Sequence, residues 1–276
     1  MRCASGNGCD GIDGAGSGNL SNINLSHLEL YGPPCVTAGT CTNGADGLNI
    51  APSNNTVTNL LFDHGWIHRY SETIRTSNWT GCTVQYTRID TMAQTTDEHE
   101  DIIFSYPIKN FTFRYNTVWG SPNDGMFFYG NEVNTQIYGN VFYHSGGALN
   151  TFYQGFTHNV YMYNNVFEND GTFGDYQPGW VYFSGTMTGD IANNIWENVN
   201  KNGTCPVCHH NAYNLSGNSS GETGSFAYTA GTQFVSKSPS NPSAADFHLT
   251  TAGATTFANK GIALSAPYNE DPDGNI

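Results

Sequence analysis

The chain has 276 residues, of which 38% are hydrophobic and only 12% charged, which suffices for the core of one large domain or two small ones. Its 23 acidic and 9 basic residues give a net charge of -14, and such a field repels nucleic acids and anionic membrane surfaces. No apolar run approaches the roughly 20 residues that span a bilayer. The composition therefore excludes a membrane-spanning protein and disfavours DNA or RNA as a partner.

The N-terminal segment MRCASGNGCDGIDG lacks the basic start, apolar centre and cleavage site of a signal peptide. Six of the seven cysteines nonetheless form local pairs in loop-like segments: Cys3 with Cys9, Cys35 with Cys41, and Cys205 with Cys208. This spacing is typical of the disulfide-closed loops of exported proteins. We interpret the chain as a mature or truncated extracellular or cell-surface protein, and expect Cys82 to be a buried thiol.

Seven segments with apolar alternation align without gaps and repeat along the chain. They are INLSHLEL from Ile23, LLFDHGWI from Leu60, VQYTRIDT from Val84, FRYNTVWG from Phe113, IYGNVFYH from Ile137, MYNNVFEN from Met162 and IANNIWEN from Ile191. A second short strand follows in most units, from Leu48, Ile74, Ile102, Met126, Leu149 and Trp180. Short strands repeating every 24 residues or so predict a β-solenoid, whose coils bury their inward faces against one another.

The fourth column of the aligned first strands supports this register. It reads Ser26, Asp63, Thr87, Asn116, Asn140, Asn165 and Asn194. Asparagines at one turn of successive coils can donate amide hydrogen bonds along the stack, and they tolerate the left-handed backbone of a sharp turn. We expect this ladder to be structural.

On these repeats the chain resembles the right-handed parallel β-helices of the pectate-lyase-like superfamily. The resemblance covers about residues 19–215 and implies an all-β fold: a right-handed parallel β-helix, or β-solenoid, of about seven coils. We expect a single domain over 1–276, closed by a C-terminal segment from about 216 to 276. Members usually carry an N-terminal capping helix, and none is evident here, which leaves missing N-terminal coils as an open expectation.

An acidic column accompanies the second strands. If Leu48, Ile74, Ile102 and Met126 are equivalent inward positions, the residues two before them are Asp46, Glu72, Glu100 and Asp124. Coils about 4.8 Å apart would bring these carboxylates close enough to repel by a few kcal/mol. Shared protons, arginine partners or Ca2+ would neutralise them. Alternatively, the side chains splay into water as a solvated acidic edge.

The resemblance implies binding or cleavage of an acidic polysaccharide on the outer face of the strands, often with Ca2+. The residues expected to hold Ca2+ are Glu72, Glu100, Asp101, Asp124 and Asp46. A lyase acting on uronates also needs a cation to neutralise the uronate carboxylate and a base to remove the C5 proton. Arg75 is the first candidate, because it follows Ile74 and is expected to point outward beside Asp101. His99, Arg88 and Arg114 are the further catalytic candidates.

Aromatic residues make up 13% of the chain. Those expected to point outward are Tyr138 and Tyr163 on the first strand and Trp66, Trp119 and Tyr143 in the seventh column. On the outside of a solenoid such rings either contact sugar rings or pack beneath loops, and the sequence leaves both alternatives open. The segment CPVCHH offers zinc-ligand types, but without a second pair at suitable spacing a disulfide-closed loop is favoured.

The function predicted from these features is an extracellular, Ca2+-assisted lyase acting on an acidic (uronate) glycan. One alternative is a noncatalytic β-helix that binds glycans or builds a surface, phage-tail or fibre assembly, since stacked coils can self-assemble end to end. The second is an inverting glycoside hydrolase, which needs paired acid and base carboxylates. The chain lacks the Asp-Asp, Gly-His-Gly and Arg-Ile-Lys segments of polygalacturonase-like hydrolases, which counts against it.

Overall fold

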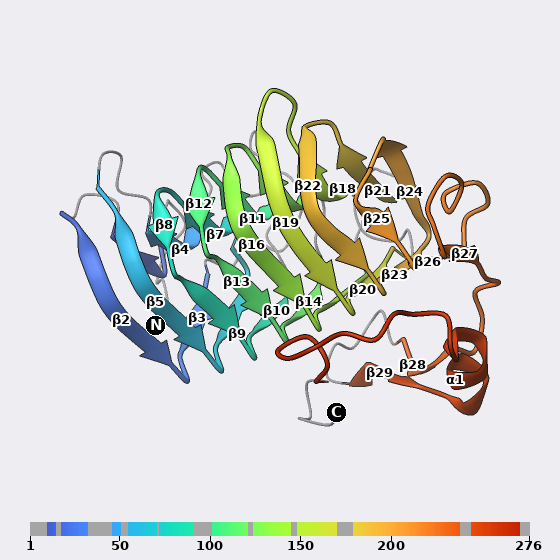
Figure 1. Cartoon of the computed structure of the whole chain (residues 1–276). Coiled ribbons are helices and arrows are strands. Elements are labelled where there is room, and N and C mark those ends of the chain that lie inside the picture. Colours follow the sequence, from blue (N-terminus) through green and yellow to red (C-terminus); the bar gives the residue numbers. More distant parts are fainter. Residues whose placement is uncertain are drawn as a thin grey trace, which may run out of the picture.

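A computed structural model describes residues 10–14, 18–32, 46–50, 55–70, 72–90, 101–120, 124–144, 148–169, 179–237 and 244–270. Across these ranges the regular structure is β-strand, apart from the short helix α1 (Thr251–Phe257) (Figure 1). No helix in these ranges is long and apolar enough to cross a membrane.

The strands stack into three long parallel sheets, which we call sheets I, II and III. Sheet I contains β1 (Ile12–Asp13), β4 (Asp46–Ile50), β7 (Glu72–Thr76), β11 (Asp101–Ser105), β15 (Asp124–Phe128), β18 (Ala148–Phe152), β21 (Gly179–Phe183) and β24 (Val199–Gly203). Sheet II contains β2 (Leu20–Ser26), β5 (Val57–Asp63), β8 (Trp79–Thr80), β9 (Thr83–Gln85), β12 (Ile108–Lys109), β13 (Thr112–Arg114), β16 (Glu132–Tyr138), β19 (Thr157–Tyr163), β22 (Thr186–Ala192) and β25 (Cys208–His209). Sheet III contains β3 (Glu29–Tyr31), β6 (Trp66–His68), β10 (Arg88–Asp90), β14 (Thr117–Trp119), β17 (Val141–Tyr143), β20 (Val166–Glu168), β23 (Ile195–Glu197), β26 (Ala212–Tyr213) and β27 (Phe226–Ala227).

The chain visits the sheets in the same order in each coil. It runs through β4, β5 and β6 in sheets I, II and III, and then returns to sheet I as β7, which pairs in parallel with β4. Because every strand pairs with its counterpart one coil away, the fold is the predicted all-β parallel β-helix. The antiparallel pair β28 (Phe234–Ser236) and β29 (Asp246–Leu249) lies after the coils, beside α1 (Figure 1).

The core lies inside the coils and consists of inward side chains stacked along the axis. In sheet I, Leu48, Ile74, Ile103 and Met126 pair in register, and each is 0% exposed. Stacked phenylalanines continue this core, with ring centroids 5.1 Å apart for Phe128 and Phe152. Each coil thus buries its apolar side chains mainly against the coils before and after it.

The asparagine ladder is present and extends one coil further than predicted. Asn116, Asn140, Asn165, Asn194 and Asn211 are each 0–1% exposed. The side-chain oxygen of each successive asparagine accepts from the backbone N–H of the residue one coil earlier, at 2.9 to 3.1 Å. The side-chain amides donate to one another and to backbone carbonyls, so these buried polar groups are satisfied within the stack.

The predicted register of the first two segments is wrong by two residues. Val84 pairs with Phe62 instead of Leu60, although the alignment from Val84 onward is confirmed. Ser26 and Asp63 therefore lie outside the ladder, in the outward row that continues at Gln85. The run Leu60, Leu61, Phe62 satisfies apolar alternation in two registers, so the sequence pattern could not choose between them.

In sheet I the predicted register slips by one residue at three strands. Ile74 pairs with Ile103, not Ile102, and the column continues through Met126 to Asn150 and Val181 in place of Leu149 and Trp180. Both Ile102 and Ile103 are 0% exposed, so either could be taken for the inward residue.

The segment that follows the coils covers part of their outer surface. Phe247 of β29 lies 4.8 Å, centroid to centroid, from Tyr143 on sheet III. Further along, Tyr268 lies 5.0 Å from Tyr138 and 4.6 Å from Tyr163 on sheet II. Asn193 fixes this segment by exchanging hydrogen bonds of 2.9 Å with the backbone of Ile262.

Candidate functional site

Acidic residues occupy one column at the start of the strands of sheet I. Asp46 pairs with Glu72, and Asp101 pairs with Asp124. Since Ile74 pairs with Ile103, Asp101 and not Glu100 is the column member that follows Glu72. The structure thus keeps the predicted acidic column and corrects one member. Glu100, like His99, lies outside the described residues.

Asp10 extends this column by one coil. Ile12 pairs with Leu48, so Asp10 stands one coil before Asp46. Its carboxylate accepts a hydrogen bond from the backbone N–H of Asp46 at 3.0 Å and from the side-chain amide of Asn49 at 3.1 Å. The column at this end is therefore held by hydrogen bonds from the next coil.

Three carboxylates of the column are buried instead of forming a solvated edge. Asp46, Glu72 and Asp101 are 8%, 7% and 0% exposed. The expected place of Asp101 outward beside Arg75 is also wrong, because Phe104 is the residue that pairs with Arg75 across the strands. Burial of acidic groups is costly unless cations or hydrogen-bond donors compensate.

Arg75 is one such compensating cation. Its Nη1 lies 3.4 Å from the Oε2 of Glu72, and its side chain is 37% exposed against 10% for Glu72. Burial lowers the pKa of the Arg75 guanidinium, but the carboxylates of Glu72 and Asp46, with a smaller contribution from Tyr106, outweigh burial and raise the pKa. The guanidinium is thus a fixed positive charge that neutralises the column on one side and meets solvent on the other.

Calcium was predicted from the same column. In the part of the chain that the structure describes, no group of three or more His, Cys, Asp or Glu side chains is arranged to hold a metal ion. Both carboxylate oxygens of Asp10 accept hydrogen bonds from amides, and the Oε2 of Glu72 forms an ion pair with the Arg75 guanidinium. Calcium binding by this column therefore stays a prediction, and we derive no step through calcium. The acidic residues from Asp97 to Glu100 lie outside the described ranges.

The structure does not bring the predicted catalytic arginines together. Arg75 lies on sheet I, Arg88 on sheet III and Arg114 on sheet II. The Nε of Arg88 contacts Asp90 at 2.5 Å, and its guanidinium lies 4.9 Å from the ring centroid of Trp66. Arg114 donates two hydrogen bonds, of 2.8 and 2.6 Å, to the side-chain oxygen of Gln85. The arginines therefore face three sides of the solenoid.

The predicted sugar-binding aromatics are mostly covered. Tyr138 and Tyr163 are 2% and 5% exposed beneath the Tyr268 segment, and Tyr143 is 1% exposed beneath Phe247. This burial favours packing beneath a following segment, which was the alternative left open. Trp119 is half-buried and stacks on His144 at 5.1 Å. Trp66 is exposed, on sheet III.

An aromatic cluster that the sequence analysis missed lies beside Arg75. We call it the aromatic patch; it consists of Phe104, Tyr106, Phe127, Tyr129, Tyr153 and Phe156. Phe104 lies under the Arg75 guanidinium at 5.6 Å and stacks on Phe127 at 5.5 Å. The patch continues from Phe127 to Tyr129 at 6.1 Å and from Tyr129 to Tyr153 at 4.8 Å. The two tyrosines are 39% and 36% exposed.

A sequence signal for this patch exists. Tyr106, Tyr129 and Tyr153 each follow the inward residue of their strand by three positions, in IFSY, MFFY and NTFY. They sit where the chain leaves sheet I for sheet II, beyond the strand alternation used to sort inward from outward residues. The patch places apolar rings and phenol groups in a row that ends at a guanidinium.

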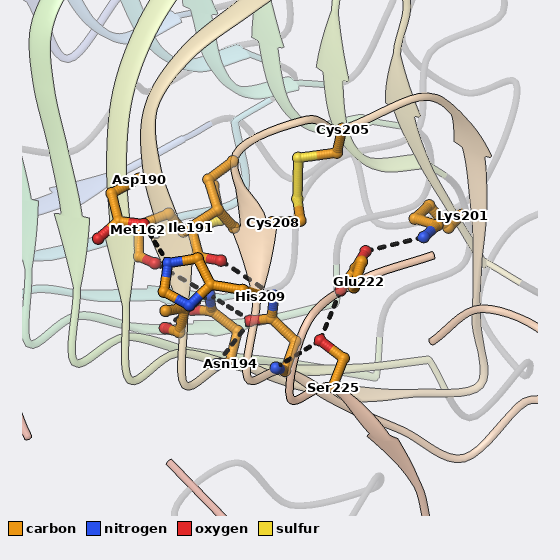
Figure 2. The surroundings of a disulfide bond; sticks show 12 residues. Met162, Asp190, Ile191, Asn194, Lys201, Cys205, Cys208, His209, Glu222 and Ser225 are labelled. Atoms are coloured by element: carbon orange, nitrogen blue, oxygen red, sulfur yellow. Dashed lines mark hydrogen bonds and ion pairs between the residues drawn. A yellow bond between two sulfur atoms is a disulfide. The ribbon is translucent and has the colours of Figure 1, made fainter. Parts of the chain in front are cut away.

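The CPVCHH segment forms a disulfide, as predicted. Cys205 and Cys208 are bonded, with Cα atoms 5.4 Å apart, so their thiolates are not zinc ligands. Figure 2 shows His209 next to this bridge, directed at Asp190, with 2.5 Å between its Nε2 and the carboxylate. Cys82 is a buried free thiol, also as predicted. The other predicted cysteine pairs lie outside the described residues.

Comparisons of the chain with protein-family models, curated proteins and solved structures gave no match. Function is therefore inferred from the residues of the site and from the fold.

Proposed function

We propose that the chain is an extracellular carbohydrate-active β-helix that binds an acidic (uronate) glycan on the outward face of sheet I. Arg75 binds the uronate carboxylate, and the aromatic patch contacts the sugar rings. The observation that carries this proposal is the register of Arg75 with Phe104 and Phe127 on adjacent strands. A glycan lying across these strands would meet a cation and apolar rings on one surface.

The chemistry of the two parts is complementary. A guanidinium is always charged and presents donors in a fork that matches a carboxylate. Exposed rings with phenol groups offer an apolar surface and hydrogen-bonding groups, as carbohydrate ligands require. Since the net charge is -14, a polyanion is attracted only where a local cation offsets the overall field.

A lyase reaction requires a base in addition to this binding surface. Arg75 is not suited to that role, because the neighbouring carboxylates raise its pKa and hold its proton. It is suited to neutralise the uronate carboxylate, which makes the C5 proton more acidic. Because Arg75 holds its proton, a lyase needs its base from His99 or another group. Without such a base, the second candidate, a noncatalytic glycan-binding β-helix, is favoured.

The fold supports both candidates. The coil pattern resembles the pectate-lyase-like superfamily, many of whose members act on acidic polysaccharides, although fold alone does not define activity. The bond between Cys205 and Cys208 supports an extracellular location, where disulfides persist. Calcium stays a prediction for Glu72, Glu100, Asp101, Asp124 and Asp46, and end-to-end self-assembly stays a prediction for the coils.

Binding to a panel of uronate polymers, measured by titration calorimetry, tests the proposal. We expect Arg75→Ala to weaken binding by about 10- to 100-fold, the loss of a charge-assisted hydrogen bond of about 1.5–3 kcal/mol. Lys109→Ala, which removes an exposed cation from sheet II, is the matched control and should bind like the wild type. Tyr129→Ala tests the aromatic patch, and Tyr86→Ala is its control, because the two rings are 39% and 37% exposed on different faces of the solenoid.

The outcomes separate the candidates. Absence of binding to every uronate polymer, or equal affinities for Arg75→Ala and Lys109→Ala, contradicts the proposed site. Binding without any rise in the ultraviolet absorbance of unsaturated uronate, with Ca2+ and with a chelator, identifies the noncatalytic protein. A rise that the chelator abolishes supports the Ca2+-assisted lyase.

A further inference from the structure

A buried carboxylate and a buried imidazole face each other beneath the aromatic patch. Glu132 is the first residue of β16, and His158 is the second residue of β19; they pair in register between adjacent coils. Both side chains are 0% exposed, and the Nδ1 of His158 contacts the Oε2 of Glu132. Burying such a pair in an apolar core costs desolvation energy, which only close pair geometry and further hydrogen bonds offset.

The hydrogen bonds define where the protons lie. The Nε2 of His158 is 3.0 Å from the backbone carbonyl of Tyr153. A carbonyl only accepts, so this nitrogen carries a hydrogen and donates it. The facing Nδ1 and Oε2 then share one proton, as an ion pair or as a neutral imidazole and carboxylic acid. In either form the pair has no net charge, which is what an apolar interior tolerates.

The surroundings of the pair are closely packed. A side-chain carbon added at Gly185 would lie 2.3 Å from the Nε2 of His158 and 2.8 Å from the carbonyl oxygen of Tyr153. On another side the ring of Phe152 packs edge-on against the imidazole at 5.4 Å. Burial raises the pKa of Glu132, and its hydrogen bond with His158 opposes that shift. The imidazole therefore has little freedom other than the orientation that reaches Tyr153.

The carbonyl that His158 holds belongs to the aromatic patch. Tyr153 begins the turn that leads from β18 to β19, and Phe156 lies in the same turn. Tyr129 begins the equivalent turn one coil earlier, which leads from β15 to Glu132. The ring of Tyr129 lies 4.8 Å from Tyr153 and 5.3 Å from Phe156. The pair thus connects the ends of two turns whose rings contact one another.

We propose that Glu132 and His158 are positioning residues for the ligand surface. They hold the turn that begins at Tyr153, and with it the rings of Tyr153 and Phe156 in the aromatic patch, in the geometry that binds glycan. This inference rests on the proposed function for its ligand but not for its structural part. Neither residue touches the ligand, because both lie inside the solenoid.

Two variants test the pair. Glu132→Gln supplies an amide N–H donor to the Nδ1 of a neutral imidazole whose Nε2–H still donates to Tyr153, and we expect it to keep both the melting temperature and the uronate affinity. The double variant Glu132→Leu/His158→Phe replaces the pair by apolar groups, a change that buried pairs often tolerate without loss of stability. We expect it to fold, to bind uronate polymer on the order of tenfold more weakly, and to exchange the amide hydrogens of residues 153–156 faster. The amides of β20 serve as the internal reference.

The exchange measurement needs no ligand, so it separates the two proposals. Faster exchange in residues 153–156, with no uronate binding by the wild type, supports the positioning role and refutes the proposed function. A double variant that is unfolded shows that the pair is only structural. A folded double variant with wild-type affinity and exchange, or a Glu132→Gln variant that loses binding while folded, also overturns the inference.

Discussion

Replacing Asn140 by alanine tests whether the asparagine ladder stabilises the solenoid. The side-chain oxygen of Asn140 accepts from the backbone N–H and the side-chain amide of Asn116, at 2.9 and 3.1 Å. Its amide donates to the carbonyl of Phe113 at 2.8 Å and to the side-chain oxygen of Asn165 at 2.9 Å. All four partners are in the coils directly before and after it.

The expected loss follows from these contacts. Each hydrogen bond contributes about 1 kcal/mol net, and a buried group left without its partner costs about as much or more. Asn140→Ala removes these four bonds between coils, and a fifth of 3.2 Å from the amide to the carbonyl of Tyr138, at a site that is 0% exposed. We therefore expect the free energy of unfolding to fall by about 3–5 kcal/mol, a large part of a total of about 5–15 kcal/mol.

Denaturant unfolding followed by circular dichroism measures this change. The matched control is Asn131→Ala, which removes an exposed asparagine that accepts one bond, from the backbone N–H of Thr157 at 2.8 Å. We expect that variant to lose about 1 kcal/mol or less. A loss for Asn140→Ala within 1 kcal/mol or so of the control would show that the ladder does not stabilise the coils and would refute the reasoning.

Two further predictions concern the disulfide and the buried tyrosines. Replacing Cys205 and Cys208 by serine opens a small loop, and loop-closure entropy predicts a loss of about 2 kcal/mol in unfolding experiments; equal stability with and without reductant would contradict this. Burial raises the pKa values of Tyr70, Tyr115 and Tyr143 from 10.0 to about 12, so the unfolded chain loses these protons first. Stability should be unaffected by these groups below pH 10 and fall as the pH rises toward 12; ultraviolet titration in which every tyrosine ionises at an ordinary pKa, with the fold intact, would contradict it.

The solenoid was predictable because segments of apolar alternation recur along the sequence at nearly regular intervals. Segments from Val84 onward align in the register that the structure shows. Two of the failures lie where apolar residues adjoin, at Leu60 to Phe62 and at Ile102 with Ile103. Alternation separates inward from outward positions only when polar residues lie between apolar ones. The acidic column, although mostly recognised, lost one correct member to the second of these slips.

The exposed surface was harder to predict than the core. Tyr138 and Tyr163 do lie on the outside of the coils, but Tyr268 covers them from more than 100 residues away in the chain. No local pattern encodes such a contact. The aromatic patch escaped notice for the opposite reason, because Tyr129 and Tyr153 lie in turns, where strand alternation carries no information about side-chain direction.

The separation of the arginines shows that the average repeat period alone does not predict which residues share a face of the solenoid. Arg88 and Arg114 are 26 residues apart, close to one repeat, yet the coil between them has 29 residues, because Arg88 pairs with Thr117. Arg114 therefore falls short of sheet III and lies on sheet II. Phe104 is 29 residues after Arg75 and is nevertheless its true lateral neighbour. Two residues of a solenoid share a face only when their spacing equals the local coil length, so a site must be assigned from strand pairing and not from the average period. By that criterion Arg75 belongs with Phe104 and Phe127, and a ligand that uses this charge must also meet these rings.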